Sequence, residues 1–503
     1  MTKTGRIAPR TATPLRSGTV NGAAKLTKRL LFTVVALSCG SSASAQAVGF
    51  VYSFLGGDSA YPSNVTPVQG RDARLYGTSS GSPGTDGSIF RLTTTGVPSP
   101  PIPLNGGNGS APSAGLALAT DGNYYGTASA GGDSGLGVLF RVSPGGLVTV
   151  LHSFEGGSDG AVPEASVIQS LDGSLYGTTL GNSASASTVY RYSASGVFST
   201  IFQFDSSQGQ SVTSPLIQST DGSLYGTASS GGANGCGSIF KLRISGTLLW
   251  SYSFVCGVGG SRPVGPLVQT ADGNFYGTTQ TGGSFNIGTV FKLDQGGVVS
   301  TLYSFQGFLG GGADGSTPDA GLVQATDGNL YGVTTAGGTY NDGTLYRITT
   351  NGSYKLLHSF NATIGNIPIA APIQHTNGLL YGTSLGGGKL RFGTLYSMNL
   401  GLPPFVALVR YAGKAGSIVQ ILGQGFTGAT SVTFNGGATS NFTVVSDTYM
   451  SAVVPSGATT GSVVVTTPTG QLKSNKSFRI TGTASAATVK SAYRASGNPK
   501  KTN

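Results

Sequence analysis

Short runs rich in β-branched and aromatic residues alternate with Gly-rich turns along most of the chain, and residues 322–360 show this pattern most clearly. Asp327-Gly328 and Asn351-Gly352 favour tight hairpins because these residues tolerate positive φ angles, and a Gly-rich loop spans 336–343. The pattern predicts four strands, at Leu322–Gln324, Leu330–Thr334, Thr344–Ile348 and Tyr354–Phe360. Four strands joined in this way form an antiparallel meander, the blade of a β-propeller.

The same unit recurs along the chain at intervals of about fifty residues. Its clearest marker is the pair Tyr-Gly, which occurs at Tyr76, Tyr125, Tyr176, Tyr225, Tyr276, Tyr331 and Tyr381. A fixed period of this length is typical of propellers and solenoids. Seven copies of a four-stranded unit therefore predict an all-β, seven-bladed propeller.

The number of strands indicates how the ring closes. The fourth-strand motif, an aromatic residue or His followed by Ser or Gln and then Phe, occurs six times, and Val97–Leu104 is a degenerate copy whose prolines fit an edge strand. No fourth strand follows the last third strand, which ends at Met398, whereas one stands alone at Val51–Phe54. We expect this N-terminal strand to complete the seventh blade, because ring closure removes exposed sheet edges.

A meander places its connections at two ends. The two tight turns of each blade lie at one end, and the longer Gly-rich connections, such as 229–236 and 256–265, lie at the other. We expect a ligand to bind at the end formed by these longer loops, since they vary from blade to blade.

Several strings identify a family resemblance over residues 50–398. LVQTADGNFYGTT at 267–279 and GTVFKLDQGGVVSTLYSF at 288–305 resemble the GloVer tandem repeats of exported bacterial proteins. The resemblance implies a propeller fold and a bacterial, exported protein, and it implies no known chemistry.

A second domain is predicted after the linker Leu402–Pro404. Evenly spaced strands suggest a small sandwich; they are expected at Ile418–Leu422, Ser431–Phe434, Phe442–Val445, Met450–Val454, Ser462–Thr466 and Lys476–Ile480. Strings such as GATSVTFN at 428–435 and GSVVVTT at 461–467 resemble an IPT/TIG domain. That resemblance implies an immunoglobulin-like fold serving as a spacer or binding module.

The N-terminus has the pattern of an export signal. Lys25, Lys28 and Arg29 precede the apolar run Leu30–Leu37, and small residues end at Ala43-Ser44-Ala45-Gln46. We expect cleavage between Ala45 and Gln46. The apolar run is too short to span a membrane, which takes about 20 residues, so we expect no transmembrane segment in the mature chain. A lipoprotein signal using Cys39 is the alternative.

These boundaries divide the chain into a signal peptide, 1–45, a propeller, 46–402, an IPT/TIG domain, 403–480, and a basic tail, 481–503, that we expect to be disordered. Composition agrees with an all-β fold, because 83 Gly and 23 Pro are poor helix formers. The net charge of +11 comes from the two termini. Residues 46–480 hold equal numbers of acids and bases, so the totals supply no basic patch for nucleic acid.

The two cysteines of the mature chain are predicted to form a disulfide. Cys236 begins a third strand and Cys256 follows its fourth, and the hairpin between them turns near Ser245-Gly246. Facing residues of an antiparallel pair share a constant sum of numbers, here about 492, so Cys236 and Cys256 should lie opposite one another. Export supplies an oxidising compartment. The alternative is two free thiols.

Candidate ligand groups have structural explanations that we prefer. His152 and His358 replace a Tyr of the fourth strand and should be half-buried, whereas His375 beside a turn should be solvated. The acids that recur once per repeat fit turns; these are Asp72, Asp121, Asp172, Asp221, Asp272 and Asp327, with Asn377 in the seventh copy. Asp159 and Asp314 lie in long loops, where calcium binding is conceivable.

A cation recurs once per repeat in the third strand, at Arg91, Arg141, Arg191, Lys241, Lys292 and Arg347, with Ser397 last. Such a ring could grip an anionic polymer. We prefer the simpler interpretation, a charge at a solvated strand position.

No motif of a nucleophile and base, a zinc protease or a phosphate loop is present. We therefore assign no catalytic, cofactor or metal residues and expect a monomeric, non-enzymatic, secreted or cell-surface protein that binds a surface protein or polysaccharide and no nucleic acid. The alternative is a propeller enzyme, a glycoside hydrolase or lyase, using carboxylates such as Glu155, Asp159 and Glu164. Fold alone cannot separate the two functions.

Overall fold

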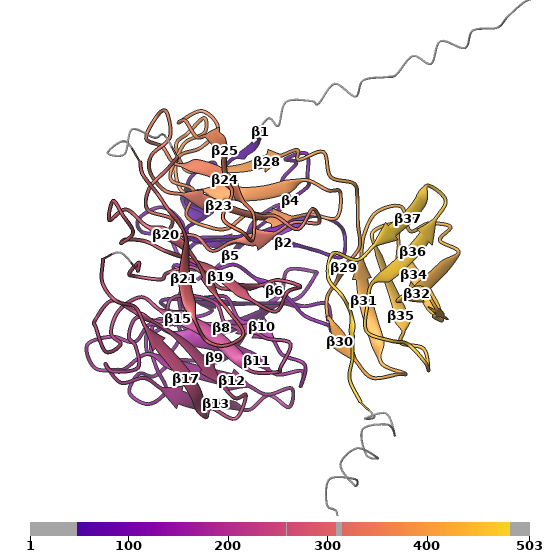
Figure 1. Ribbon diagram of the computed structural model, residues 1–503, viewed down its shortest axis with the longest axis horizontal. Helices are drawn as coiled ribbons and strands as arrows, with labels where there is room; N and C mark the ends of the chain where they lie inside the picture. The colour runs from indigo at the N-terminus through magenta and orange to yellow at the C-terminus, as the bar shows by residue number, and fades with distance from the viewer. Residues whose placement is uncertain (1–47, 258, 308–313, 483–503) are drawn as a thin grey trace, which may run out of the picture. The chain divides into compact units, whose positions relative to one another are not determined.

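A computed structural model describes residues 48–257, 259–307 and 314–482 (Figure 1). Within these ranges the regular structure is β-strand, apart from one short 3-10 turn at Gly57–Ser59. The predicted all-β class is therefore confirmed. The signal peptide with its cleavage site at Ala45 and Gln46, and residues 483–503 of the basic tail, lie outside the described residues.

Four-stranded antiparallel sheets repeat from residue 48 to residue 398, and the described part contains seven of them. In each sheet the strands are given from the innermost to the outermost. The first sheet contains β2 (Val68–Gln69), β3 (Leu75–Ser79), β4 (Ser88–Leu92) and β5 (Ile102–Pro103), and the second contains β6 (Ala117–Leu118), β7 (Tyr124–Ala128), β8 (Val138–Val142) and β9 (Val148–Ser153). The third contains β10 (Ile168–Gln169), β11 (Leu175–Thr179), β12 (Thr188–Tyr192) and β13 (Phe198–Gln203).

The remaining four sheets have the same order. They are β14 (Ile217–Gln218), β15 (Leu224–Ala228), β16 (Ser238–Leu242) and β17 (Leu248–Ser253); β18 (Val268–Gln269), β19 (Phe275–Thr279), β20 (Thr289–Leu293) and β21 (Val299–Ser304); β22 (Val323–Gln324), β23 (Leu330–Thr334), β24 (Thr344–Ile348) and β25 (Tyr354–Ser359); and β26 (Ile373–Gln374), β27 (Leu380–Ser384), β28 (Thr394–Met398) and β1 (Val48–Ser53).

The N-terminal strand completes the last sheet, as predicted. β1 pairs antiparallel with β28, from Val48 opposite Met398 to Ser53 opposite Thr394. The degenerate copy is also an edge strand, since β5 is the outermost strand of its sheet. Here the paired strand is shorter than predicted, only Ile102–Pro103, because prolines lack the N–H that a longer ladder needs.

A repeated hydrogen bond joins five of the seven pairs of neighbouring sheets. A Gln at the end of an innermost strand accepts a backbone N–H from the turn of the preceding sheet, for example Thr120 N to Gln169 Oε1 at 2.9 Å. The last and first sheets use the same bond, because Thr376 N donates to Gln69 Oε1 at 3.0 Å. The ends of the repeat array therefore meet with the contact that joins interior neighbours.

The apolar core lies between neighbouring sheets. One cluster combines Tyr76 and Ile89 of the first sheet with Tyr124 and Phe140 of the second, and equivalent clusters follow around the array. Because each sheet buries side chains against both neighbours, stability depends on an uninterrupted sequence of sheets.

A buried aromatic residue occupies the middle of every third strand, and three of the seven carry a hydroxyl without a partner. Tyr190, Tyr346 and Tyr396 each have a buried hydroxyl with no hydrogen-bond partner in the described structure. The other four sheets have a Phe at this position. A buried, unpaired hydroxyl costs about 1–3 kcal/mol.

Replacing these tyrosines should therefore stabilise the protein. Each of Tyr190→Phe, Tyr346→Phe and Tyr396→Phe is expected to raise the free energy of unfolding by about 1 kcal/mol, measured by denaturant titration. Tyr331→Phe is the control, since the Tyr331 hydroxyl donates to Asp327 Oδ2 at 2.8 Å and its loss should destabilise. Destabilisation by all three buried variants would contradict this account.

The segment after residue 402 forms two further four-stranded sheets around one core. One sheet contains β29 (Ala407–Leu408), β31 (Ile418–Leu422), β35 (Tyr449–Val453) and β34 (Phe442–Ser446), and the other contains β33 (Ala438–Thr439), β32 (Ser431–Phe434), β36 (Val463–Thr467) and β37 (Gly470–Lys473). β30 (Ala412–Gly413) pairs in parallel with β38 (Arg479–Ile480). Ile421 and Met450 of the first sheet pack with Phe434 and Val465 of the second, as in a sandwich.

Candidate functional site

The long connections gather at one end of the sheets. At five of the seven junctions, the loop that leaves a fourth strand pairs with the second-to-third loop of the next sheet through an isolated bridge, such as Ser110 with Ala130 and Ser316 with Ala336. Backbone hydrogen bonds join the same two loops at the other two junctions. We call the connections between second and third strands, and between fourth and first strands, the loop face. The tight turns lie at the opposite ends of the strands.

The recurring turn acids have a structural role, as predicted, and the structure adds a second function. Asp327 Oδ1 accepts the backbone N–H of Asn329 at 3.1 Å, which fixes the turn. Its Oδ2 accepts the hydroxyl of Tyr331 at 2.8 Å. The same Asp-to-Tyr bond occurs at Tyr76, Tyr125, Tyr176 and Tyr276, and Asn377 bonds Tyr381 in the last sheet. The Tyr of six of the seven Tyr-Gly pairs therefore anchors its own turn, whereas in the fourth sheet Asp221 pairs with Lys241.

Two of the six third-strand cations pair with the acids of these turns. Lys241 Nζ lies 2.8 Å from Asp221 Oδ2, and Arg191 lies 3.4 Å from Asp172 Oδ2. The Asp221 carboxylate raises the pKa of Lys241. These pairs support the solvated-charge interpretation over an anion-binding ring. Exposed pairs of this kind contribute about 0–1 kcal/mol.

The two loop acids considered for calcium each hold their own loop. Asp159 accepts His152 Nε2–H at 3.0 and 3.1 Å and the Glu155 N–H at 2.8 Å. Asp314 accepts the Tyr303 hydroxyl at 2.6 Å and the Gly307 N–H at 2.8 Å. Across the described residues, no three His, Cys, Asp or Glu side chains come together as a metal site would need.

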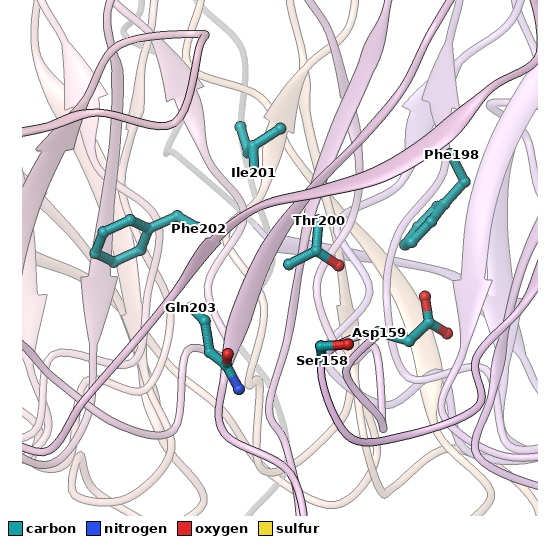
Figure 2. A pocket seen from close by; sticks show the side chains of 7 residues that line it. All are labelled: Ser158, Asp159, Phe198, Thr200, Ile201, Phe202 and Gln203. Atoms are coloured by element: carbon teal, nitrogen blue, oxygen red, sulfur yellow. The ribbon is translucent and has the colours of Figure 1, made fainter.

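A shallow pocket of about 480 Å³ lies beside Asp159 (Figure 2). Ser158 and Asp159, which lie in a loop, form one side of the pocket. Phe198 and Thr200 of the outer strand β13 line the other side. The Phe198 ring is itself covered by His152, with ring centroids 3.5 Å apart. His152 is half-buried, as predicted, and its ring covers one face of Phe198.

A second cavity, of about 320 Å³, is lined by residues from all seven repeated sheets. They come from the segments that lead into the innermost strands and are mostly Pro, Ala, Gly, Val, Leu and Ile. Two carboxyl groups line it, Glu164 before the third sheet and Asp319 before the sixth. Each precedes the Tyr of its Tyr-Gly pair by twelve residues, so they occupy the same position of the repeat.

Burial perturbs both carboxyl groups of this central cavity. Desolvation raises the pKa of Glu164 and also that of Asp319, although Gln280, Thr335 and Arg262 oppose the shift at Asp319. Thr335 Oγ1 donates to Asp319 Oδ2 at 3.3 Å. Glu155, Asp159 and Glu164 are thus not one constellation: Asp159 is tied to His152, and the acid that shares a cavity with Glu164 is Asp319.

His375 is buried, and the expectation that it would be solvated is wrong. Its side chain is 1% exposed. Nε2–H donates to the Ala73 carbonyl of the first sheet at 3.0 Å, and Nδ1 accepts the Asn377 N–H at 3.1 Å. His375 therefore joins the last sheet to the first, and desolvation lowers its pKa. His358 is half-buried, as predicted.

This burial gives the protein a defined pH dependence. Because the folded-state pKa of His375 lies below the unfolded value of about 6.5, only the unfolded chain binds a proton just below that pH. The contribution of neutral His375 to the free energy of unfolding is complete above pH 6.5 and is lost as pH falls toward the folded pKa. The free energy of unfolding then changes by at most about 1.4 kcal/mol per pH unit. Denaturation of wild type and His375→Gln between pH 7.5 and 5.5 tests this: the variant should show the smaller slope, and equal slopes would contradict it.

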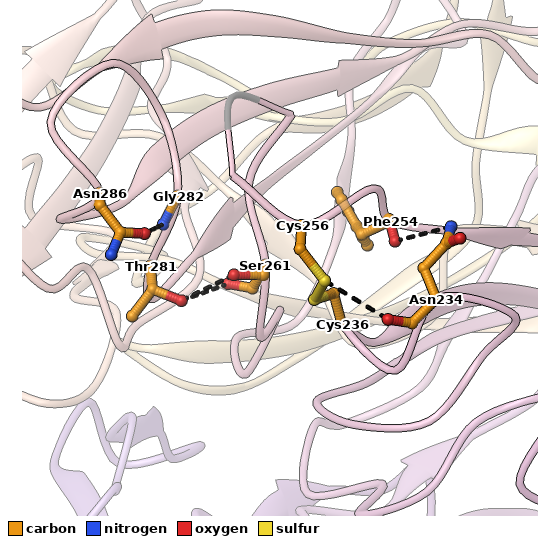
Figure 3. The surroundings of a disulfide bond; sticks show 8 residues. All are labelled: Asn234, Cys236, Phe254, Cys256, Ser261, Thr281, Gly282 and Asn286. Atoms are coloured by element: carbon orange, nitrogen blue, oxygen red, sulfur yellow. Dashed lines mark hydrogen bonds between the residues drawn. A yellow bond between two sulfur atoms is a disulfide. The ribbon is translucent and has the colours of Figure 1, made fainter.

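The predicted disulfide joins Cys236 and Cys256, with Cα atoms 5.5 Å apart (Figure 3). Paired residues of β16 and β17 nearest the bridge are Ser238 with Ser253 and Ile239 with Tyr252. Their sum is 491, one less than expected, so the bridge lies just beyond the regular ladder. The Asn234 side-chain amide donates to the Phe254 carbonyl at 3.1 Å and holds the loop beside it.

Breaking this bridge should destabilise without unfolding the protein. A bridge that closes a loop of 20 residues is expected to contribute about 3 kcal/mol through the unfolded chain. Cys236→Ala/Cys256→Ala should therefore lower the denaturation midpoint under oxidising conditions. When the wild type is unfolded in an alkylating agent without reductant, mass spectrometry should find Cys236 and Cys256 unalkylated, because both sulfurs are held in the disulfide. Free thiols at both positions would contradict the assignment.

Repeated four-stranded sheets with recurring turn bonds define a tandem-repeat protein with a propeller-like fold. The chain belongs to the family described as Gloeobacter/Verrucomicrobia repeat, whose model matches residues 40–220, 145–312 and 215–445. This confirms the resemblance carried by the Tyr-Gly strings. No curated protein matches the chain.

Several solved structures are similar in shape. The structure titled "Streptogramin B lyase structure" has a TM-score of 0.49 and 13% identity, over 70% of this chain and 97% of the other. Virginiamycin B lyase from Staphylococcus aureus has a TM-score of 0.49 and 12% sequence identity, over 70% of this chain and 99% of the other. A fungal alcohol oxidase of the AA5 family has a TM-score of 0.49 and 14% sequence identity, over 84% of this chain and 98% of the other. At these scores and identities the likenesses carry no argument about activity.

No helix in the described ranges has the length and apolar character that crossing a membrane requires.

Proposed function

We propose that this chain is an exported, non-enzymatic protein that binds a partner at the cell surface or outside the cell, with the loop face as its ligand face. The observation that carries the proposal is the use of the loop acids as structural groups: Asp159 and Asp314 are committed to His152, Tyr303 and backbone N–H groups. The disulfide at the base of this face supports an oxidising location.

The proposal includes the architecture. The seven repeated sheets are the blades of a propeller closed by β1, and residues 403–480 are an IPT/TIG domain with an immunoglobulin-like fold. Closure is supported by the bond between Thr376 and Gln69, and the sandwich by the shared core of the two C-terminal sheets. Residues 1–45 act as a signal peptide cut before Gln46, and the mature protein is a monomer.

A propeller enzyme acting on polysaccharide is the second candidate, and one observation favours it. Glu164 and Asp319 line a common cavity of about 320 Å³, and burial raises the pKa of both. A raised pKa suits a general acid. In this function Glu164 and Asp319 form the acid pair, in place of the three carboxylates of one loop.

One experiment separates the two functions. The mature chain is applied to a glycan and surface-protein array and, in parallel, incubated with neutral and acidic polysaccharides whose reducing ends are assayed. Binding without new reducing ends supports the proposal. Reducing-end release that disappears in Glu164→Gln and in Asp319→Asn would overturn it in favour of the enzyme.

A further inference from the structure

The charged residues of the repeat array are divided between the two ends of its sheets. The connections of the loop face hold ten acidic residues and three basic ones, Arg262, Lys389 and Arg391. The strands and tight turns of residues 48–398 hold ten basic and seven acidic residues. The equal totals over residues 46–480 therefore conceal a negative loop face.

The negative charge is concentrated on the connections of the first three sheets. Residues 80–87, 104–116, 129–137, 154–167, 180–187 and 204–216 contain no Lys or Arg. They carry Asp86, Asp133, Glu155, Asp159, Glu164 and Asp205, which we call the acidic sector. Asp133, Glu155 and Asp205 are exposed. In the described structure, none of the six is paired with a Lys or Arg.

The rest of the loop face exposes large apolar side chains. Phe285, Tyr340 and Leu390 are 38%, 60% and 44% exposed. Each follows the Tyr of its Tyr-Gly pair by nine residues, so the same loop position is apolar on three consecutive sheets. Val255 and Leu55, 62% and 63% exposed, lie two residues after the ends of outer strands on this face. We call these five residues the apolar sector.

We propose that the loop face docks a basic polypeptide segment of a partner protein that also carries apolar side chains. The inference rests on the proposed function, because it assumes that this face binds a partner, and it names the chemistry of that partner. Lys and Arg side chains complement the acidic sector, whereas a nucleic acid or an acidic polysaccharide is repelled by it.

The composition of the apolar sector favours a polypeptide over a glycan. Three of its five members, Leu55, Val255 and Leu390, are aliphatic, and aliphatic side chains gain most from covering one another. A glycan is held chiefly by aromatic faces and directed hydrogen bonds. In the proposed complex the acidic sector speeds association and gives it salt dependence, and apolar burial supplies most of the affinity.

The test uses synthetic peptides as probes and the mature, full-length chain. Affinity is measured for a Lys/Leu peptide, a Lys/Ser peptide and a Glu/Leu peptide of equal length. The Lys/Leu probe is expected to bind tightest, and its affinity should fall at least about tenfold when salt rises from low to physiological strength, because exposed charges are then screened. The Lys/Ser probe should bind more weakly and the Glu/Leu probe not at all.

Matched variants assign the binding to the acidic sector. The triple variant Asp133→Asn/Glu155→Gln/Asp205→Asn is expected to bind the Lys/Leu probe with about tenfold lower affinity, and this affinity should depend less on salt. Asp121→Asn/Asp294→Asn/Asp327→Asn removes equal charge from the turn ends and should change affinity less than about twofold. Asn377 already occupies the turn position of Asp121 and Asp327, and the uncharged Thr349 occupies that of Asp294. The control should therefore fold, and thermal melting of both variants checks this.

Several outcomes would overturn the proposal. They are equal affinity for the Glu/Leu probe, an unchanged affinity in the acidic-sector variant, an equal loss in the turn-end control, or binding of amine-bearing glycans with no binding of either Lys peptide. The last outcome leaves the proposed binding function intact and rejects only the polypeptide partner. Polysaccharide degradation, in contrast, rejects the proposed function itself.

Discussion

Deletion of residues 46–55 is expected to abolish the stable fold of the whole repeat array. The deletion removes β1, the outer strand of the last sheet, which pairs with β28 over its length. It also removes Phe54, which is fully buried between Leu395 of the last sheet and Phe90 of the first. Because neighbouring sheets share their cores, the loss reaches both ends of the array. The melting temperature should fall by more than about 10 °C, or the chain should fail to fold.

Two point variants keep this prediction testable if the deletion does not express. Phe54→Ala is expected to cost about 3–5 kcal/mol, as for other buried Phe side chains. Phe50, on the same strand, is 49% exposed, so Phe50→Ser should change stability by less than about 0.5 kcal/mol. Calorimetry of the three proteins decides. A deletion that melts like the parent, with a neutral Phe54→Ala, would show that the strand does not close the array.

Much of the fold is predictable because the turns carry local chemistry. Asp-Gly and Asn-Gly pairs fix hairpins, so the strands Leu330–Thr334 and Thr344–Ile348 are predicted to the residue. A strand end that no Gly turn follows is predicted less exactly: the strand predicted to end at Phe360 ends at Ser359. β37 was not predicted. Its Gly and Lys residues have low strand propensity, and it forms because it pairs with β36.

The candidate sites were predictable only in part, because they combine distant residues. Cys236 and Cys256 belong to one hairpin, so their pairing follows from local register. Glu164 and Asp319 lie in different sheets, and only their equal distance from a Tyr-Gly pair could have linked them. His375 looks solvated beside its turn, yet ring closure brings the Ala73 carbonyl against it. A local pattern cannot show a contact that ring closure creates.

The Gly of each Tyr-Gly pair is explained by the strand beside it, and this gives the second large effect. Gly226 pairs with Phe240, whose ring lies across it. A Cβ atom at Gly226 would stand 2.4 Å from the ring and 3.0 Å from Leu216 Cδ2. The six other Tyr-Gly glycines face an aromatic residue in the same register. The repeat thus keeps Gly so that an aromatic ring can pack over the backbone.

Gly226→Ala is therefore expected to destabilise the protein, although Ala loses less conformational entropy than Gly when a strand forms. Overpacking in a dense core typically costs about 1–3 kcal/mol, and the fixed ring places this site at the upper end. Ala at Gly107 is the control: the nearest atom to a Cβ there would be Asn105 Oδ1 at 3.8 Å, an ordinary contact, so Gly107→Ala should change stability by less than about 0.5 kcal/mol. Denaturant titration measures both.

A double variant tests the physical cause. Phe240→Leu shortens the side chain that crosses Gly226, so a methyl group there should find room. The cost of Gly226→Ala/Phe240→Leu should be smaller than the sum of the single costs by at least about 1 kcal/mol, as expected for residues in direct contact. Additive costs would mean that Gly226 is required for its backbone conformation and not for the ring. Since Gly226 has no positive φ angle, we expect the coupling.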